Sequence, residues 1–293
     1  MLGCSIWVLA AALTPSTAQA AAGAAQGDPV WSAEDAYAAG FDTGVASLSA
    51  GDRFLDHFAA RDAFYFVVGS RGQANARFQL SFQYDFLAED GSLGAGDSPW
   101  DGLGFAYTQM SLWDLQSDSV PFFDTNYRPS LFWRRETIIG APGEPRWDFE
   151  FGYEHESNGR DGDDSRSINS LYVRPTYHHP LDERWEFRTT PRVWAYIGDL
   201  SDNPDIADYR GLFDWRLQLV DRQGFGFSTN LRKGGESSYG SVQVDVSYPM
   251  NELLGGNLDL FLYLQYFNGW GESLLVYDEK LPAQFRIGIA LVR

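Results

Sequence analysis

Cysteine is nearly absent from this 293-residue sequence, and positive charge is scarce. The single cysteine, Cys4, excludes an intramolecular disulfide framework and a structural zinc site. The chain has 22 Lys and Arg residues and 40 Asp and Glu residues, which gives a net charge of −18. Because nucleic-acid phosphates need a basic protein surface, no nucleic-acid partner is expected.

Long apolar runs are missing beyond the first residues. Leu2–Leu13 is mostly apolar, and the tripeptide AQA at 18–20 supplies a small-residue cleavage pattern, so residues 1–20 are predicted to be an export signal. The alternative is an uncleaved anchor, but a membrane-spanning helix needs about 20 apolar residues and this run is shorter. Residues 21–60 show little periodicity and are predicted to form an N-terminal periplasmic segment. No transmembrane helix is expected after them.

Aromatic residues are abundant, although the chain as a whole is hydrophilic. They make up 16% of the sequence, while the mean hydropathy is −0.30. After residue 60, apolar and polar residues alternate with period two, which is typical of β-strands. The predicted strands are 62–71, 77–87, 102–115, 129–138, 147–158, 167–179, 185–198, 211–221, 224–233, 239–249, 257–268 and 284–292.

These strands predict an all-β fold, a twelve-stranded antiparallel transmembrane β-barrel over residues 61–293. Lengths near ten residues suit a tilted strand that crosses a bilayer, and an even number closes an antiparallel barrel. The alternative is a soluble β-sandwich or lipocalin-like barrel, whose apolar face points inward. The export signal, the Tyr and Trp residues near strand ends and the charges in mid-strand favour the membrane barrel. The final residues, Leu291-Val292-Arg293, lack the aromatic that usually ends such barrels.

One strand carries reactive side chains on its apolar face. In the segment 147–158, His155 and Ser157 continue the stripe of odd-numbered aromatics, because side chains two apart share a face. A hairpin with the next strand brings Asn169 beside them. A serine, an imidazole and a group that orients the ring are the parts of a nucleophilic triad. The alternative is an inert His-x-Ser pair at a strand end.

Two further features have competing interpretations. The loop 161–165 is rich in the oxygen ligands that calcium prefers, and otherwise it is a solvated acidic turn. Gln109 shares the face of Leu103, Phe105 and Tyr107, so its amide is predicted to point into lipid, where an unsatisfied amide is costly. A second subunit could satisfy that amide, and a local network with Ser111 is the alternative.

The stretch HESNGRDGDDSRSIN at 155–169 resembles the active-site segment of the outer membrane phospholipase A family, with its pattern His-x-Ser-Asn-Gly-Arg and then Ser-Arg-Ser-x-Asn. Further segments resemble the family in the family's order: YTQMSLWDL (107–115), TNYRPSLF (125–132), DNPDIADY (202–209), SYP (247–249) and GWGESLLVYD (269–278). The resemblance implies a calcium-dependent phospholipase A1/A2 and lysophospholipase. It also implies a homodimer in the outer membrane of a Gram-negative bacterium, with membrane phospholipids as substrate.

The resemblance assigns roles to individual residues. It makes Ser157 the nucleophile, His155 the general base and Asn169 the orienting group. The implied calcium ligands are the carbonyl of Arg160, the hydroxyl of Ser165, a serine of the partner subunit matched by Ser119 with Ser117 as the alternative, and Asp202 in the unpaired monomer. A second acidic position of the monomer site is Gly162 here, and Gln109 is placed in the dimer interface.

Two other functions remain open at this point. A non-enzymatic outer-membrane porin or structural barrel would need an open lumen, whereas the inward Arg, Trp and Tyr residues predict a filled one. A soluble secreted esterase would dissolve without detergent once the export signal was removed.

Overall fold

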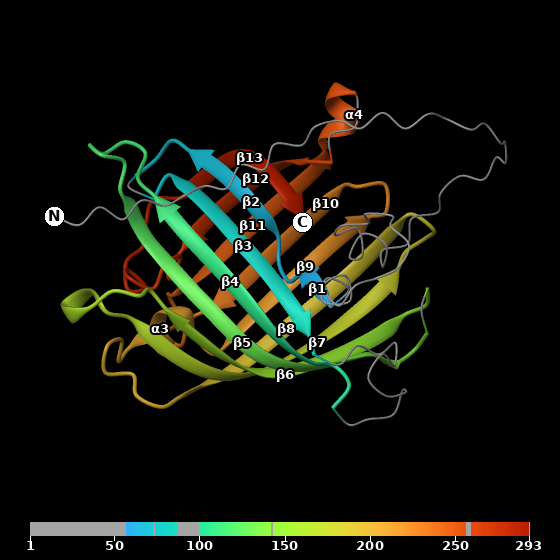
Figure 1. The fold of residues 1–293 in the computed structure, drawn as a ribbon, viewed down its shortest axis with the longest axis horizontal. Helices are drawn as coiled ribbons and strands as arrows, with labels where there is room; N and C mark the ends of the chain where they lie inside the picture. The colour runs from blue at the N-terminus through green and yellow to red at the C-terminus, as the bar shows by residue number, and fades with distance from the viewer. Residues whose placement is uncertain (1–56, 73, 87–99, 142, 256–258, 293) are drawn as a thin grey trace, which may run out of the picture. The chain divides into compact units, whose positions relative to one another are not determined.

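The computed structural model describes residues 57–292 except 73, 87–99, 142 and 256–258 (Figure 1). The predicted export signal at 1–20 and all but the last four residues of the segment 21–60 lie outside these residues, so both stay predictions.

The described residues form one antiparallel sheet that closes on itself as a twelve-stranded barrel (Figure 1). Each strand pairs with its neighbour in sequence, and the last strand pairs with β2. The short strand β1 (Phe58–Ala60) pairs with the same edge of β3 as β2 does, so the two are halves of one barrel strand. The remaining strands are β2 (Phe64–Gly69), β3 (Ala76–Asp85), β4 (Leu103–Trp113), β5 (Phe122–Ile139), β6 (Arg146–Ser157), β7 (Ser167–Pro180), β8 (Trp185–Ile197), β9 (Phe213–Asp221), β10 (Gly226–Lys233), β11 (Gly240–Pro249), β12 (Phe261–Gly269) and β13 (Gln284–Val292).

The predicted barrel is confirmed, with one boundary clearly wrong. The strand expected at 129–138 begins at Phe122, seven residues earlier, where it pairs with Trp113 at the end of β4. Pro, Asp and Asn residues make this part of the sequence look like a turn. In the structure, Asp124 and Asn126 point inward and bond the segment 273–275, so the polar residues belong to the lumen face of a strand.

The two faces of the barrel differ as a membrane protein requires. Large apolar side chains are exposed on the outer face, including Leu131, Phe151, Leu171 and Phe285, and Phe285 is 67% exposed. The lumen face carries the charges, among them the buried Arg188, Asp214 and Asp245. This arrangement is opposite to that of a lipocalin-like barrel with an apolar interior. None of the described helices has the length and hydropathy that a membrane-spanning helix needs.

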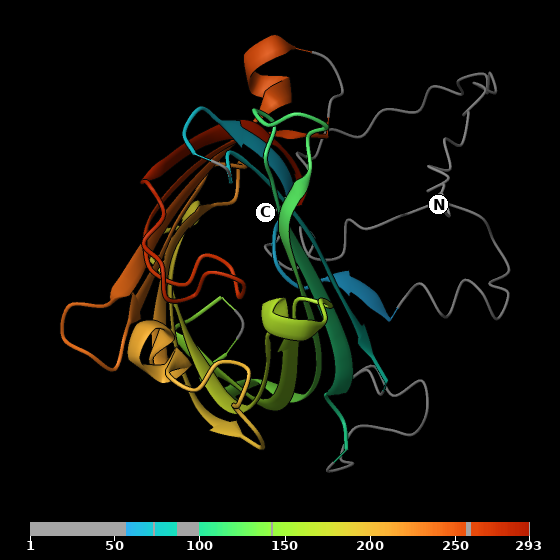
Figure 2. The same cartoon turned by 90° about the vertical axis from the view of Figure 1, so that its left-hand side faces the viewer.

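Charged side chains cross the lumen. Between β1 and β2 the chain bends inward, so Arg61 donates a 2.8 Å hydrogen bond to Glu150 on β6. Asp62 accepts one of 2.9 Å from Arg216 on β9. These bonds bridge opposite walls of the barrel. Figure 2 shows the strands that surround the lumen, turned by 90° from Figure 1. A lumen filled in this way does not suit an open pore.

One end of the barrel gathers the loops that matter for function. The 3-10 turn η1 (Gly162–Asp164) lies between β6 and β7, and α3 (Ile206–Arg210) lies between β8 and β9. Ile168 packs against Ile206, Leu274 and Tyr277, which joins the start of β7 to α3 and to the segment after β12. The other short helix, α4 (Met250–Leu254), follows β11 at the opposite end of the barrel (Figure 1).

Candidate active site

The β6–β7 hairpin brings the predicted triad residues to neighbouring positions. His155 lies directly opposite Asn169, and Ser157 lies opposite Ser167. Because side chains two apart in a strand share a face, His155 and Ser157 both lie on the outer face, beside the exposed Phe151. The register follows from the alternation and from the loop that joins the two strands.

His155 and Asn169 are in direct contact. Nδ1 of His155 lies 2.9 Å from Oδ1 of Asn169. An amide oxygen can only accept, so Nδ1 carries the ring proton and donates it. Nε2 of the neutral imidazole is then left as an acceptor, which is the state that a general base needs.

Ser157 is near this pair but not bonded to it. Within the described residues, the structure has no hydrogen bond between Ser157 and His155. Such bonds are often long in enzymes without substrate and shorten when substrate binds. Ser157 is partly exposed on the outer face, so its hydroxyl can be reached from the lipid side.

Tyr153 is a fourth member of the cluster that sequence reasoning missed. Its hydroxyl donates a 2.6 Å hydrogen bond to Oδ1 of Asn169, the same oxygen that His155 contacts. From the sequence, Tyr153 is simply one of the odd-numbered aromatics of the apolar stripe. Its position on the same face, two residues before His155, was the available signal.

Ion pairs on the lumen face of β6 hold the strand in position. Glu154 accepts hydrogen bonds from Arg128 at 3.1 Å and from Arg192 at 2.9 Å. Glu156, beside Ser157, accepts one of 3.1 Å from Arg210 at the end of α3. Ion pairs to three different elements therefore hold the reactive end of β6 in place.

Asn158 organises the loop after Ser157. Its side chain is buried; the amide group donates to the carbonyl of Asp164, and its oxygen accepts from the backbone N–H of Arg166. Gly159 follows with φ +66°, and a Cβ there would lie 3.0 Å from the ring of Tyr127. The two loop bonds need the amide of Asn158, and the positive φ and the close ring contact need the missing side chain of Gly159.

The loop also brings two predicted calcium ligands together. The Ser165 hydroxyl donates a 3.0 Å hydrogen bond to Asp202, from the segment between β8 and β9. The side chain of Arg160 extends toward β5, where it donates 2.6 Å to the carbonyl of Phe123. In the described part of the chain, no three His, Cys, Asp or Glu side chains are grouped to hold a metal. A cation here would rely on hydroxyl and carbonyl oxygens together with Asp202, and such hard oxygen donors fit calcium.

The loop between β4 and β5 distinguishes the two candidate serines. The Ser117 hydroxyl donates a 2.6 Å hydrogen bond to Asp114, which holds the pKa of that carboxyl below its usual value. Ser119 is exposed, has φ +66° and forms no hydrogen bond among the described residues. No contact joins either serine to Ser165 or Asp202 within the described chain. Only the Ser119 hydroxyl is uncommitted.

Gln109 forms the local network that was its alternative interpretation. It accepts a 3.1 Å hydrogen bond from the Tyr107 hydroxyl and donates one of 3.4 Å to Ser111. The second bond is long, so the amide N–H groups are only partly satisfied within one subunit.

Comparisons with known proteins agree with this geometry. Residues 61–291 match the family described as Phospholipase A1. A Phospholipase A1 of Salmonella typhimurium is 35% identical over 221 residues, which cover 74% of this chain and 68% of that protein. A crystal structure of the Salmonella typhi outer membrane phospholipase dimer with bound calcium has a TM-score of 0.64 and 30% identity, and the match covers 80% of this chain and 92% of that one. An Escherichia coli outer membrane phospholipase A, in an active-site mutant with alanine in place of an asparagine, has a TM-score of 0.63 and 29% identity, covering 79% and 90%.

Proposed function

The chain belongs to the phospholipase A1 family of outer-membrane phospholipases, and we propose that it hydrolyses acyl esters of phospholipids with Ser157, His155 and Asn169 as a calcium-dependent dimer in the outer membrane. The observation that carries the triad is the 2.9 Å contact between His155 and Asn169 on the outer face of the barrel. The active-site asparagine of the Escherichia coli relative supports the role of Asn169.

The proposed reaction is acyl transfer through the serine. His155 Nε2 accepts the Ser157 proton as the serine oxygen attacks the ester carbonyl. The proton then passes to the leaving oxygen, and the lysophospholipid departs. Water, deprotonated by the same imidazole, releases the fatty acid from Ser157. Through both halves, the Asn169 oxygen accepts from Nδ1–H and stabilises the imidazolium without supplying a charge.

In the dimer, calcium would be held by the Ser165 hydroxyl, the Arg160 carbonyl and Ser119 of a second subunit. In the unpaired monomer, Asp202 would take part instead. When bound, the ion would stabilise negative charge on the ester oxygen. The calcium and the dimer of the Salmonella typhi relative support this assignment. Gln109 would lie in the dimer interface, where a second copy could satisfy its remaining amide hydrogens.

The lipid-facing position of the site favours phospholipid over a soluble ester. A phospholipid in the outer leaflet would reach Ser157 without leaving the bilayer. Phospholipid is scarce there while the membrane is intact, so we infer that the enzyme is idle until membrane asymmetry fails.

Covalent labelling tests the nucleophile directly. An alkyl fluorophosphonate should modify Ser157 in the folded protein with calcium present, and peptide mass spectrometry should locate the adduct. Modification of another serine, with Ser157 untouched, would contradict the proposal.

The porin alternative predicts steady single-channel conductance in planar bilayers, whereas the filled lumen predicts none.

A further inference from the structure

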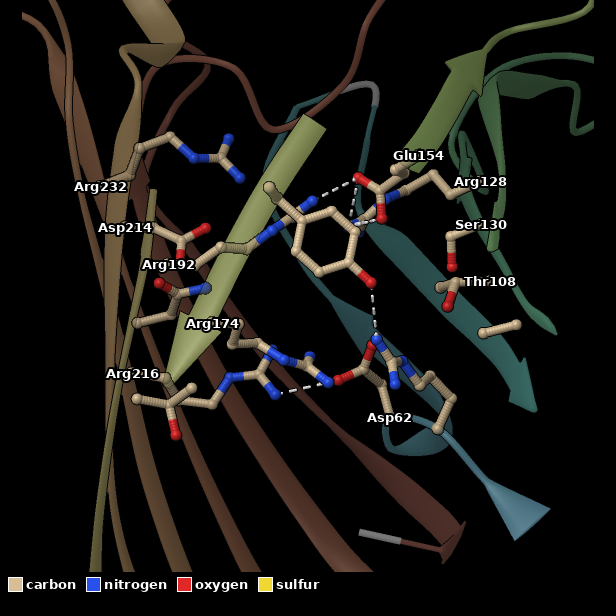
Figure 3. Close-up of a pocket in the computed structure, with 15 residues that line it drawn as sticks. Asp62, Thr108, Arg128, Ser130, Glu154, Arg174, Arg192, Asp214, Arg216 and Arg232 are labelled. Atoms are coloured by element: carbon tan, nitrogen blue, oxygen red, sulfur yellow. Dashed lines mark hydrogen bonds and ion pairs between the residues drawn. The ribbon is translucent and has the colours of Figure 1, made fainter. Parts of the chain in front are cut away.

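A polar cavity of about 80 Å³ lies inside the barrel, on the face of β6 opposite to the proposed triad (Figure 3). Its lining comes from the bend before β2 and from strands β4 to β10. A single buried water needs only about 10–15 Å³, so there is room for a small ion with several waters.

The cavity is positively charged in a strongly acidic protein. Six arginines and three carboxylates line it: Arg61, Arg128, Arg174, Arg192, Arg216 and Arg232, with Asp62, Glu154 and Asp214. Glu150 pairs with Arg61 and Glu156 with Arg128, and Arg210 pairs in turn with Glu156. Including them still leaves seven guanidinium groups against five carboxylates. In the adjoining group, Arg77 and Arg286 pair with Glu272, and Asp245 is linked to them through Gln243 and Gln265, so two guanidinium groups stand beside two carboxylates.

Arg232 accounts for much of this excess of positive charge. Within the described chain, the guanidinium of Arg232 forms no ion pair. Its one side-chain hydrogen bond there is a 3.3 Å contact with the carbonyl of Gly271. Its Nε is buried without a hydrogen-bond partner, as are Nε of Arg128 and Nη1 of Arg210. Asp214 lies opposite Arg232 in the β9–β10 pairing, but no ion pair joins them. Arg232 is half-buried. Withdrawing a guanidinium from water without a counter-ion is costly, and a bound anion would offset that cost.

We propose that this cavity binds a small oxyanion of the phosphate class. Guanidinium groups bind tetrahedral oxyanions through paired N–H donors, more strongly than they bind a spherical ion. Ser130 and Thr190 add hydroxyl groups to the lining. The bound anion joins β5, β8, β9 and β10 across the lumen and stabilises the barrel, independently of the hydrolytic site.

Inorganic phosphate is the probe that tests this site. The refolded chain in detergent, without calcium and with chelator, is heated in sodium phosphate or in sodium chloride of equal ionic strength. Phosphate should raise the unfolding temperature saturably beyond chloride. Equal effects of the two salts would overturn the proposal.

Two substitutions should change phosphate affinity in opposite directions. Arg232→Gln should weaken it about tenfold or more, since it removes a charged donor. Asp214→Asn should strengthen it, because it removes a competing carboxylate. The matched control is Arg71→Gln, which removes the same charge from an exposed turn and should leave the affinity unchanged. An equal loss in Arg71→Gln and Arg232→Gln would show a general charge effect and overturn the site.

Folding of each variant is checked by its heat-modifiable migration on SDS gels. If Arg232→Gln fails to fold, Asp214→Asn decides the matter alone. Unchanged or weaker phosphate binding in that variant would overturn the proposal.

Discussion

Asn169 holds the ring of His155 from the neighbouring strand, with Oδ1 of the amide 2.9 Å from Nδ1 of the imidazole. The two residues face each other across the β6–β7 pairing. The contact places the ring proton on Nδ1, so that Nε2 is the acceptor that the proposed mechanism requires.

Replacing the orienting group should slow turnover without affecting lipid binding. Asn169→Ala removes an acceptor for a ring that becomes charged during the reaction, and hydrogen bonds to charged groups contribute about 1.5–3 kcal/mol. We expect kcat to fall roughly 10- to 100-fold at constant KM. Asn169→Asp, which keeps an acceptor, should retain more activity than Asn169→Ala. Full kcat in Asn169→Ala would remove Asn169 from the mechanism.

Tyr153 should act through Asn169. Tyr153→Phe keeps the ring on the outer face and deletes only the donor to Oδ1, so kcat should fall about 2- to 10-fold, as expected for a neutral hydrogen bond. In the Asn169→Ala background, the same change should have no further effect. Tyr248→Phe, also on an exposed tyrosine, is the control. Additive losses in the double mutant would mean that Tyr153 acts independently of Asn169.

Substitutions of the two serines of the β4–β5 loop should have different effects, one on the calcium requirement and the other on stability. Ser119→Ala should raise the calcium concentration needed for half-maximal activity, because its hydroxyl is uncommitted. Ser117→Ala should lower stability at neutral pH and have little effect in strong acid, because it deletes the bond that depresses the pKa of Asp114. That contribution disappears as pH falls through the folded-state pKa of Asp114, since the carboxyl is then protonated in both states.

Calcium titrations of activity and thermal unfolding at several pH values measure the two effects. A raised calcium requirement in Ser117→Ala, with Ser119→Ala normal, would identify Ser117 as the ligand instead.

Gln109 should contribute to dimerisation despite its local bonds. Gln109→Leu keeps the size of the side chain but removes the amide, so the dimer should dissociate about tenfold more readily. Sedimentation equilibrium in detergent, with calcium and a non-hydrolysable substrate analogue, measures this. Gln79→Leu is the control, because Gln79 faces the lumen side of β3 and donates to Ala63. Equal dimer stability in Gln109→Leu and wild type would leave only the local role.

Alternation predicted the strands and the shared face of His155 and Ser157, because the period of two fixes side-chain direction. The export signal, the Tyr and Trp residues near strand ends and the mid-strand charges were needed to favour a membrane barrel over a soluble one. Alternation failed to predict residues 122–128 as strand, because Asp124 and Asn126 resemble turn residues although they bond a distant loop. The contact between Ser165 and Asp202 and the lumen bond between Asp62 and Arg216 join residues 37 and 154 positions apart. The first contact depends on how two neighbouring hairpins lie side by side, and the second depends on barrel closure. No local pattern contains either arrangement. Tyr153 was missed because a tyrosine on an apolar face reads as packing.

The measurement that tests the central claim most directly is hydrolysis of a defined phospholipid in detergent, with calcium or with chelator, by wild type and Ser157→Ala. The account predicts fatty-acid release by wild type only with calcium, and a loss of at least about a thousandfold in Ser157→Ala. Calcium-dependent hydrolysis by Ser157→Ala at the wild-type rate would contradict it.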